Sequence, residues 1–540
     1  MDGVRVVLAH TLLDDRLQHR GDRIAREERH VAGEVPATSP RRGCRPGVSR
    51  ARDGYQSAVF LTDIPLPRSR AATLALVAAL CALALGPSAA HAGPTSPNAV
   101  VVSMGDSYIS GEGGRWAGNS VDPAPGNDGT DRACVPAGPT CQVDKSRVYV
   151  GGSDANGCHR SDVAEVLSAG FPDAQGVNIA CSGAVTKNLF RSSNGGVGQN
   201  GEPPEADQLL PIAQADRVKM IVVSIGGNDL GFASIVAACL QAYETRQGPC
   251  NTTQQPLIEQ KTAQAQANVE KAIDEIRAVM TQAGYAATDY RLVLQTYSSV
   301  IPRASEARYP QDGPQRTAFG CPFYDDDMTW ARDEGAPEIG AMVKRAAAAR
   351  GVEVLDLVDT LQGHEICSKS TAESTPTSQP GPAGSEWGRF VGASTVQQGD
   401  LQEAFHPNAY AQQAFGACLA KLYAQAPGSF ACNGAAGAGV TATTLTASSR
   451  SALTPGVARA LRLTARRVHA RRAAHACWRF TVAAAGTRVS GAVVRFAGHR
   501  ARTGRAGAAT ICTQRRGSQR ATASRAGFVR AVRTVHVRRG

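Results

Sequence analysis

The chain has 540 residues, a length that accommodates about two to four domains. Its hydrophobic content of 42% is that of a globular protein, and no run of about 18 apolar residues follows position 92, which excludes a membrane-spanning helix there. The net charge is +12, but residues 451–540 hold 20 arginines and no Lys, Asp or Glu, which leaves −8 for residues 1–450. This asymmetry indicates that the C-terminal part is a separate module.

The first predicted element along the chain is an export signal. Arginines precede an apolar stretch, Ala71–Leu85, which is followed by the small residues of Ala90-His91-Ala92. This order predicts a secretory signal peptide at 66–92, with a short membrane anchor as the alternative. Residues 1–65 are rich in arginine and lack apolar periodicity, so we interpret them as a mis-assigned or disordered N-terminal extension.

Residues 97–432 alternate between strand-like and helix-like patterns. Five continuously apolar runs are typical of parallel strands covered on both faces: Ala99–Met104, Gly176–Cys181, Lys219–Ile225, Arg291–Tyr297 and Val352–Leu357. Between and after them, apolar residues recur at helical spacing, as in the stretches 258–280 and 411–422. The alternation predicts an α/β fold, a three-layer α/β/α sandwich with a parallel sheet.

Three polar residues follow strands or begin helices in this region. Ser107 follows the first strand within "GDSYISGEGG", whose glycines allow a sharp turn and close approach of a substrate. Asn228 follows the third strand in "GGND", and His406 precedes the last helix in "HPN". A serine nucleophile needs a base, usually His, and donors for an oxyanion, and the shared edge of parallel strands could bring these groups together. The G-x-S-x-G motif of α/β-hydrolases is absent.

Cysteine usage agrees with export. Of 14 cysteines, Cys44 and Cys81 precede position 92, and the remaining 12 form an even set. Spacing suggests that neighbours pair, although sequence alone leaves the connectivity open: Cys134–Cys141, Cys158–Cys181, Cys239–Cys250, Cys321–Cys367, Cys418–Cys432 and Cys477–Cys512. No C-x-x-C pair is present, so we expect no metal site.

The C-terminal part begins with a small, polar, Gly-rich stretch, Asn433–Ser449, which predicts a linker over 433–469. Beyond it, apolar residues alternate with polar ones, as in Trp478, Phe480 and Val482. Turn signals separate such runs, which predicts a small β-sandwich over 470–540. Its pattern loosely resembles the Ig-like sandwiches appended to secreted bacterial enzymes.

Four blocks of the chain resemble those of the SGNH (GDSL-type) hydrolases: Ser107 in "GDSYISGEG", Gly183 in "ACSGA", Asn228 in "GGND" and His406 in "HPN". The resemblance covers 97–432 and is closest to secreted actinobacterial lipases and esterases. It implies a flavodoxin-like fold, with Ser107 as nucleophile and His406 as base. It also implies an oxyanion hole made by the amides of Ser107 and Gly183 and the side chain of Asn228, and it implies no cofactor.

The sequence departs from the family pattern before the histidine. The family often has Asp three residues upstream, where this chain has Glu403. We expect Glu403 to orient His406, with a backbone carbonyl or Asp400 as the alternatives. His159, beside a cysteine, is a further candidate contact to the site.

These features predict a secreted serine hydrolase that cleaves carboxylic esters of lipids or small alcohols. The alternatives are a carbohydrate deacetylase or phospholipase with the same centre, or a non-enzymatic wall-binding protein. The Arg-rich C-terminal module suggests contact with an anionic cell surface or membrane. Nucleic acid would satisfy the same electrostatics, but the signal peptide argues against it as a partner.

Overall fold

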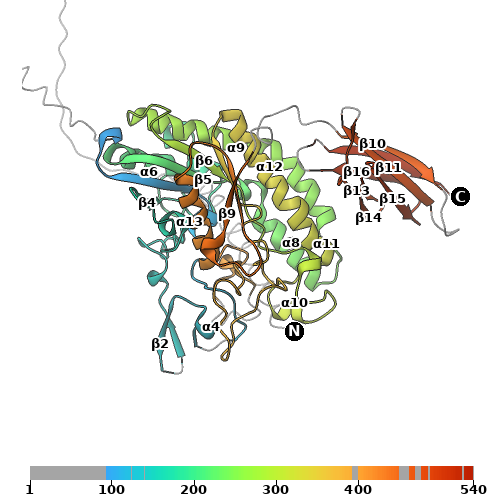
Figure 1. The fold of residues 1–540 in the computed structure, drawn as a ribbon, viewed down its shortest axis with the longest axis horizontal. Helices are drawn as coiled ribbons and strands as arrows, with labels where there is room; N and C mark the ends of the chain where they lie inside the picture. The colour runs from blue at the N-terminus through green and yellow to red at the C-terminus, as the bar shows by residue number, and fades with distance from the viewer. Residues whose placement is uncertain are drawn as a thin grey trace, which may run out of the picture. The chain divides into compact units, whose positions relative to one another are not determined.

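The computed structural model describes residues 93–122, 125–138, 140–391, 399–448, 461–468, 476–484, 487–525, 528 and 530–538. The predicted extension and signal peptide lie outside these residues. An α/β domain occupies residues 93–448 and an all-β region occupies residues 461–538 (Figure 1).

The α/β domain contains nine strands, eleven helices and eight shorter turns among the described residues. The strands are β1 (Ala99–Gly105), β2 (Cys134–Ala137), β3 (Thr140–Val143), β4 (Gln175–Asn178), β5 (Arg217–Ser224), β6 (Arg291–Gln295), β7 (Glu353–Asp356), β8 (Phe430–Asn433) and β9 (Thr444–Ala447). The helices are α3 (Ser107–Ser110), α4 (Pro125–Gly129), α5 (Glu165–Ser168), α6 (Glu205–Ala215), α7 (Gly227–Leu230), α8 (Phe232–Glu244), α9 (Asn251–Gln282), α10 (Gln315–Ala318), α11 (Asp325–Trp330), α12 (Ala336–Arg350) and α13 (Ala409–Tyr423). The short turns are η1 (Gly93–Thr95), η2 (Lys145–Arg147), η3 (Thr186–Leu189), η4 (Ser192–Asn194), η5 (Ala304–Glu306), η6 (Ala331–Gly335), η7 (Leu401–Glu403) and η8 (Val440–Ala442).

The main sheet has the strand order β4-β1-β5-β6-β7-β8-β9. All neighbours are parallel except β8 and β9, which pair antiparallel. The first five strands follow the flavodoxin-like order, in which the chain reverses direction beside β1. Strands β1 and β5 end level with each other, since Gly105 pairs with Ser224. Such an edge is where open α/β sheets bind ligands.

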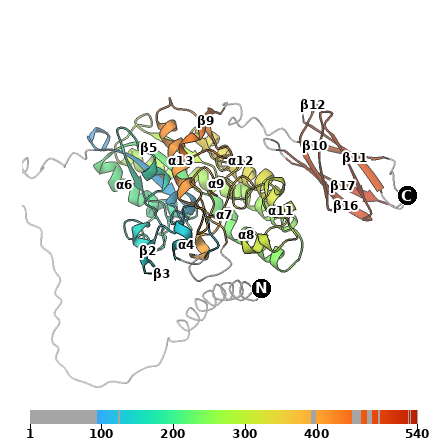
Figure 2. The ribbon, with the colours of Figure 1, turned by 60° about the horizontal axis from the view of Figure 1, so that its bottom comes forward.

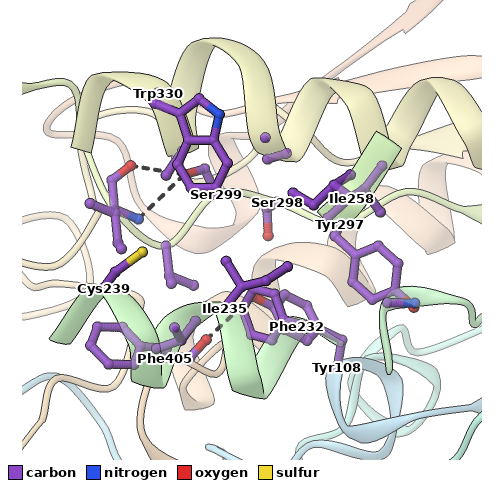
Figure 3. Close-up of a pocket in the computed structure, with 18 of the residues that line it drawn as sticks. Tyr108, Phe232, Ile235, Cys239, Ile258, Tyr297, Ser298, Ser299, Trp330 and Phe405 are labelled. Carbon is purple, nitrogen blue, oxygen red and sulfur yellow. Dashed lines mark hydrogen bonds between the residues drawn. The ribbon is translucent and has the colours of Figure 1, made fainter. Parts of the chain in front are cut away.

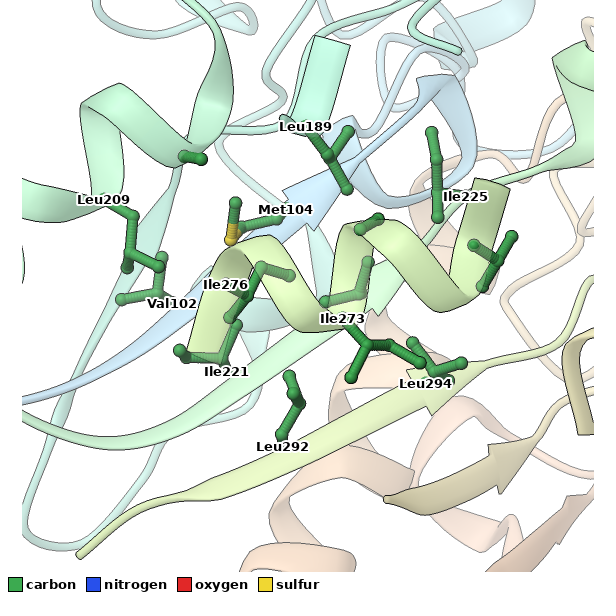
Figure 4. Packing of buried hydrophobic residues seen from close by; sticks show 14 of the residues in the cluster. Val102, Met104, Leu189, Leu209, Ile221, Ile225, Ile273, Ile276, Leu292 and Leu294 are labelled. Atoms are coloured by element: carbon green, nitrogen blue, oxygen red, sulfur yellow. The ribbon is translucent and has the colours of Figure 1, made fainter. Parts of the chain in front are cut away.

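Helices cover both faces of the sheet, as the continuously apolar strands predict. On one face, α6, α9 and α12 bury side chains such as Leu209, Ile273 and Met342 against β1, β5 and β6. Figure 4 shows Leu209 and Ile273 packed among residues of these strands. Arg350 of α12 bonds to Asp274 of α9, and the two helices run side by side in Figures 1 and 2. On the other face, α5, α8 and α13 pack against alternate residues of the same strands. Full burial of one such side chain stabilises by about 1.5–3 kcal/mol, so the two layers hold the sheet edge rigid.

The predicted fold class and five parallel strands are confirmed, but the predicted linker is wrong at both ends. Residues 430–447 form β8 and β9 and extend the main sheet, because the buried Cys432 ties β8 to α13 through its disulfide. The first strand of the all-β region, Leu461–Val468, also lies within the predicted linker range 433–469. The stretch 449–460 lies outside the described residues.

The all-β region consists of two antiparallel sheets, consistent with the predicted β-sandwich. Its strands are β10 (Leu461–Val468), β11 (Ala476–Ala484), β12 (Thr487–Arg488), β13 (Val493–Phe496), β14 (His499–Arg502), β15 (Ala508–Thr513), β16 (Gly517–Ser524) and β17 (Ala531–Val537). One sheet joins β10, β11, β12 and β15, and the other joins β14, β13, β16 and β17. Phe480 and Phe496 lie 4.9 Å apart between ring centroids in the apolar core, so the predicted alternation describes the buried face.

All six predicted cysteine pairs lie at disulfide distance: Cys134–Cys141, Cys158–Cys181, Cys239–Cys250, Cys321–Cys367, Cys418–Cys432 and Cys477–Cys512. Six disulfides are compatible with an extracellular protein. Within the described ranges, no helix combines the length and apolar character needed to cross a bilayer.

Candidate active site

Ser107 lies directly beyond the carboxyl end of β1, as the first residue of α3. Gly105 adopts a φ of +129°, and a Cβ at this position would collide with the carbonyl oxygen of Ser224 on β5. Asp106 caps α3, since its carboxylate accepts a hydrogen bond of 3.1 Å from the amide of Tyr108. This tight turn places the Ser107 hydroxyl at the edge of the sheet.

The structure brings Ser107 and His406 together from positions 299 residues apart. The Oγ atom of Ser107 lies 2.7 Å from Nε2 of His406. On the other side of the ring, Nδ1 lies 3.1 Å from the carbonyl oxygen of Ala404. Because a carbonyl can only accept, Nδ1 of the neutral ring carries the proton and Nε2 is left to accept from the serine.

The carboxylate of Glu403 does not contact the imidazole. Its fully buried carboxylate accepts hydrogen bonds of 2.8 Å from the indole N–H of Trp116 and from the hydroxyl of Tyr149. The expectation that Glu403 orients His406 is therefore corrected: the turn η7 directs its side chain inward, and the carbonyl of Ala404 takes that place.

Electrostatics accounts for the inward position of Glu403. Burial raises the pKa of this carboxyl, and the guanidinium of Arg115, 3.9 Å away, opposes that rise. Asp400, the other alternative, forms an ion pair of 2.5 Å with Lys145 at the surface. The third alternative, a backbone carbonyl, is the one that the structure supports.

The second and third sequence blocks lie against each other. Gly183 adopts a left-handed φ of +78°, and the next residue, Ala184, accepts a hydrogen bond of 2.9 Å from Nδ2 of Asn228. The following residue of the third block, Asp229, accepts bonds from the amide (3.0 Å) and hydroxyl (2.5 Å) of Thr186. These contacts hold Gly183 and Asn228 in one rigid unit.

Two backbone donors remain available beside this unit. Among the hydrogen bonds between described residues, neither the amide of Ser107 nor the amide of Gly183 donates to a protein acceptor. Backbone N–H groups in folded proteins normally find a partner, in protein, water or ligand. Together with the carboxamide of Asn228, they are suited to hold an oxygen atom of a ligand.

An apolar pocket extends from Ser107 and Asn228 between α8, α11 and the segment after β6. Figure 3 shows Tyr108 and Tyr297 toward one end of this pocket and Cys239 and Trp330 toward the other. The side chains labelled around it are mostly aromatic or aliphatic: Tyr108, Phe232, Ile235, Cys239, Ile258, Tyr297, Trp330 and Phe405, with Ser298 and Ser299. The pocket can therefore accept an extended apolar group whose polar end lies at Ser107.

Burial changes the protonation equilibria of two groups at the site. It lowers the pKa of His406 below its ordinary value of 6.5, although the charge of Glu112 and the carbonyl of Ala404 oppose this. The imidazole is thereby kept neutral, the form that can take a proton. Burial also raises the pKa of Asp106 to about 7, against a hydrogen bond from the hydroxyl of Tyr297.

Sequence reasoning missed Tyr297. Its hydroxyl donates to the carboxylate of Asp106 and accepts a hydrogen bond of 3.0 Å from the amide of Gly227. Tyr297 therefore links the serine turn to the turn that carries Asn228. Tyr297 follows β6 at the same edge of the sheet, and this position in the sequence could have identified it as a residue of the site.

Comparisons with known proteins found one family and one solved structure to which the chain is similar. The model of the GDSL-like Lipase/Acylhydrolase family matches residues 103–414. Among solved structures, the lipase Lip_vut3 from a goat rumen metagenome matches with 13% identity over 59% of this chain and 94% of that chain, at a TM-score of 0.27. No protein with a curated description matches the chain.

The fold is that of the SGNH, or GDSL-type, hydrolases, with a parallel sheet between two helical layers and the sequence blocks at its edge. Since the family match spans more than half of the chain, the protein belongs to the GDSL-like lipase/acylhydrolase family. It is a hydrolase of the esterase or lipase type.

Proposed function

We propose that this protein is a secreted serine hydrolase that cleaves carboxylic esters carrying apolar acyl chains. The observation that supports this best is the 2.7 Å contact between Ser107 Oγ and His406 Nε2 beside the apolar pocket. A hydroxyl within hydrogen-bond reach of an imidazole base is the arrangement that activates serine as a nucleophile.

In the proposed reaction, Nε2 of His406 takes the hydroxyl proton while Oγ of Ser107 attacks the acyl carbon of the ester. The carbonyl π electrons move to oxygen and form a tetrahedral oxyanion. When this collapses, the bond from carbon to the alcohol oxygen breaks, and His406 gives its proton to the departing alkoxide. Water then attacks the acyl-enzyme by the same steps, which releases the acid and restores Ser107.

The proposed oxyanion hole consists of the amides of Ser107 and Gly183 and the carboxamide of Asn228. Each donor of this kind stabilises the transition state by about 3–4 kcal/mol. The carbonyl of Ala404 orients the imidazole in the tautomer that the reaction needs. No metal or organic cofactor enters these steps.

The apolar lining favours an acyl ester over an acetylated carbohydrate. Rings of Tyr108, Phe232 and Trp330 offer a long apolar chain a desolvated surface, whereas an acetyl group would leave most of it unused. Lipids, including phospholipids, are therefore preferred to polysaccharides as substrates.

Hydrolysis of p-nitrophenyl esters of graded chain length tests this function. We expect kcat/KM to rise from acetate to chains of medium length and Ser107→Ala to abolish turnover. An active Ser107→Ala variant would refute the assignment. Labelling by a fluorophosphonate probe separates the enzyme from a non-enzymatic wall-binding protein, because an inactive site would not react.

Secretion is part of the proposal. Six disulfides need an oxidising compartment to form and persist. The N-terminal sequence of protein recovered from the culture medium should begin at Gly93. Protein retained in the membrane fraction with residues 66–92 intact would instead support an anchor.

We further propose that the C-terminal module contacts anionic surfaces. Arg462, Arg466 and Arg479 are exposed on the sheet formed by β10, β11 and β15. Basic residues near an anionic lipid surface contribute about 1 kcal/mol each. The bounds of the strands place the two regions at about 93–448 and 461–538. We propose that these two regions are the functional units of the protein.

A further inference from the structure

A buried carboxylate near the candidate site is not used by the mechanism above. Glu112 lies five residues after Ser107, and its side chain is fully buried. Its amide donates a hydrogen bond of 3.2 Å to the carbonyl of Ser107, so the residue belongs to the same turn. A buried charge needs compensation by several partners, which makes its contacts informative.

Three side chains from distant segments donate to this carboxylate. Nδ1 of His159 lies 2.8 Å from Oε1 and 2.9 Å from Oε2 of Glu112. The hydroxyl of Ser182 also donates to Oε2, and the amide of Gln402 reaches the same oxygen at 3.3 Å. The amide of Gln402 lies 3.3 Å from the hydroxyl of Ser182 as well, so the group is continuous.

Two of these donors belong to segments that carry a residue of the proposed mechanism, and the third, His159, is linked to one of those segments. Ser182 directly precedes Gly183, and Gln402 lies four residues before His406. His159 follows Cys158, whose carbonyl accepts a hydrogen bond of 3.1 Å from the amide of Ser182. Glu112, on the turn that begins with Ser107, thus contacts both the segment that carries Gly183 and the segment that carries His406.

We propose that Glu112 is a positioning residue that holds Gly183 and His406 in register with Ser107. The inference rests on the proposed function, because it assigns to Glu112 the alignment of that same reaction centre. Loss of alignment by about 1 Å can lower a rate by about 100-fold, so a residue that touches no substrate can still control turnover.

The charge of Glu112 adds to its geometric role. His406 is oriented by the neutral carbonyl of Ala404, which carries no full negative charge to stabilise an imidazolium. The negative charge of Glu112 acts on His406 in the direction that raises its pKa. This direction favours the imidazolium that forms at His406 during the proposed reaction.

The surroundings hold the cluster in a strained conformation. His159 adopts a left-handed φ of +46°, which costs free energy for a residue other than glycine. Its ring stacks on Tyr149 with centroids 4.7 Å apart, and the hydroxyl of Tyr149 lies between the carbonyl of Glu112 and the carboxylate of Glu403, within hydrogen-bond distance of both. A strained backbone conformation persists only where the contacts around it fix the backbone in place. The contacts of His159 do this, as expected for a residue that helps to hold the site in position.

The test is Glu112→Gln in the full-length oxidised protein, assayed on a soluble p-nitrophenyl ester. We expect kcat to fall by about 10- to 100-fold while KM changes by less than about threefold, because alignment of the reacting groups is lost and ground-state binding is kept. The matched control is Glu275→Gln, which removes a buried carboxylate that binds Arg191 and Asn194. We expect this control to keep its kcat even where its melting temperature falls.

Ser182→Ala provides a second, milder variant in case Glu112→Gln does not fold. It removes the donor next to Gly183 and leaves the charge of Glu112 in place, so kcat should fall by about 5- to 20-fold at unchanged KM. Wild-type kcat in either folded variant would overturn the inference. If Ser107→Ala is inactive in the same assay, such a result leaves the proposed function intact; if Ser107→Ala is active, the proposed function itself fails.

Discussion

The α/β domain and the C-terminal sandwich place some of their arginines in contrasting environments. In the α/β domain, Arg115 is 3% exposed and forms two hydrogen bonds with the carboxylate of Asp131, at 2.8 and 2.6 Å. In residues 451–540, 20 arginines occur without a single Asp or Glu. There, Arg466 and Arg479 are exposed and stand directly opposite each other on β10 and β11.

Burial explains this difference. A buried guanidinium needs partners within the fold, because the loss of hydration must be offset. An exposed guanidinium stays hydrated and is screened by salt, so it needs no partner within the fold. The buried charge of Arg115 therefore holds its loop in place, whereas the exposed charges of Arg466 and Arg479 are available to the surroundings of the protein.

Removal of a buried partner should have the largest effect on stability. Asp131→Asn leaves Arg115 buried without its bidentate acceptor, which is expected to destabilise the α/β domain by about 3–5 kcal/mol. Urea denaturation followed by loss of ester hydrolysis reports on this domain. Arg466→Gln, made as the comparison in the sandwich, should change the stability of that module by less than about 0.5 kcal/mol, as measured by hydrogen exchange of the amides of β10 and β11. Equal shifts in the two variants would contradict the contrast between the regions.

Removal of the Asn228 carboxamide should have the next largest effect, which is on the catalytic rate rather than on stability. Asn228→Ala removes one proposed oxyanion donor and should lower kcat by about 10²- to 10³-fold with little change in KM. The hydrogen bond from Asn228 to the carbonyl of Ala184 is also lost, so the melting temperature must be measured alongside. A fall of less than about tenfold would assign the oxyanion to the two backbone amides alone.

The fold could be predicted from sequence because the burial of a strand or helix determines the spacing of its apolar residues. Residues that are buried on both faces of a strand, such as 220–223 of β5, form a continuous apolar run. A strand with one face exposed to solvent, such as Ala531–Val537, alternates between apolar and polar residues. The predicted linker failed for the same reason: Thr444–Ala447 lies at the edge of the sheet, carries small polar residues and leaves no apolar pattern.

The site could be predicted only where side chains follow strand ends. Ser107 and Asn228 stand at such positions, His406 stands before a helix instead, and the structure brings Ser107 and His406 into contact. The group that faces Nδ1 could not be predicted, because η7 alone decides whether the carboxylate of Glu403 or the carbonyl of Ala404 points to the ring. Backbone carbonyls have no sequence signature.

Protonation of His406 should have a smaller effect on the rate of ester hydrolysis, which changes gradually with pH. The imidazole accepts a proton only when neutral, so the rate falls as pH drops through the pKa of His406 in the folded protein. Burial lowers that pKa below 6.5, against the opposing charge of Glu112, so activity at pH 6.5 should exceed half of its plateau. A profile of kcat/KM from pH 4 to pH 8 locates the acid limb. An inflection at or above pH 7 would show that the charge of Glu112 outweighs burial.

The smallest expected effect on stability belongs to the paired arginines of the sandwich. Like charges directly opposite on neighbouring strands are destabilising, by about 0.2–1 kcal/mol at most. Arg466→Gln with Arg479→Gln should therefore leave the sandwich equally or slightly more stable. The same double variant should bind less to vesicles of phosphatidylglycerol and phosphatidylcholine in co-sedimentation, while its turnover of a soluble ester is unchanged.

Arg505→Gln with Arg515→Gln is the matched control, because it removes two exposed arginines, and the same charge, from turns of the same module. If the sheet of β10, β11 and β15 is the contact surface, this control keeps most of its vesicle binding. Equal losses in both double variants would mean that net charge alone attracts the module to the vesicle. No binding by the unmodified protein at low salt, where electrostatic attraction is strongest, would remove the anionic surface as a partner.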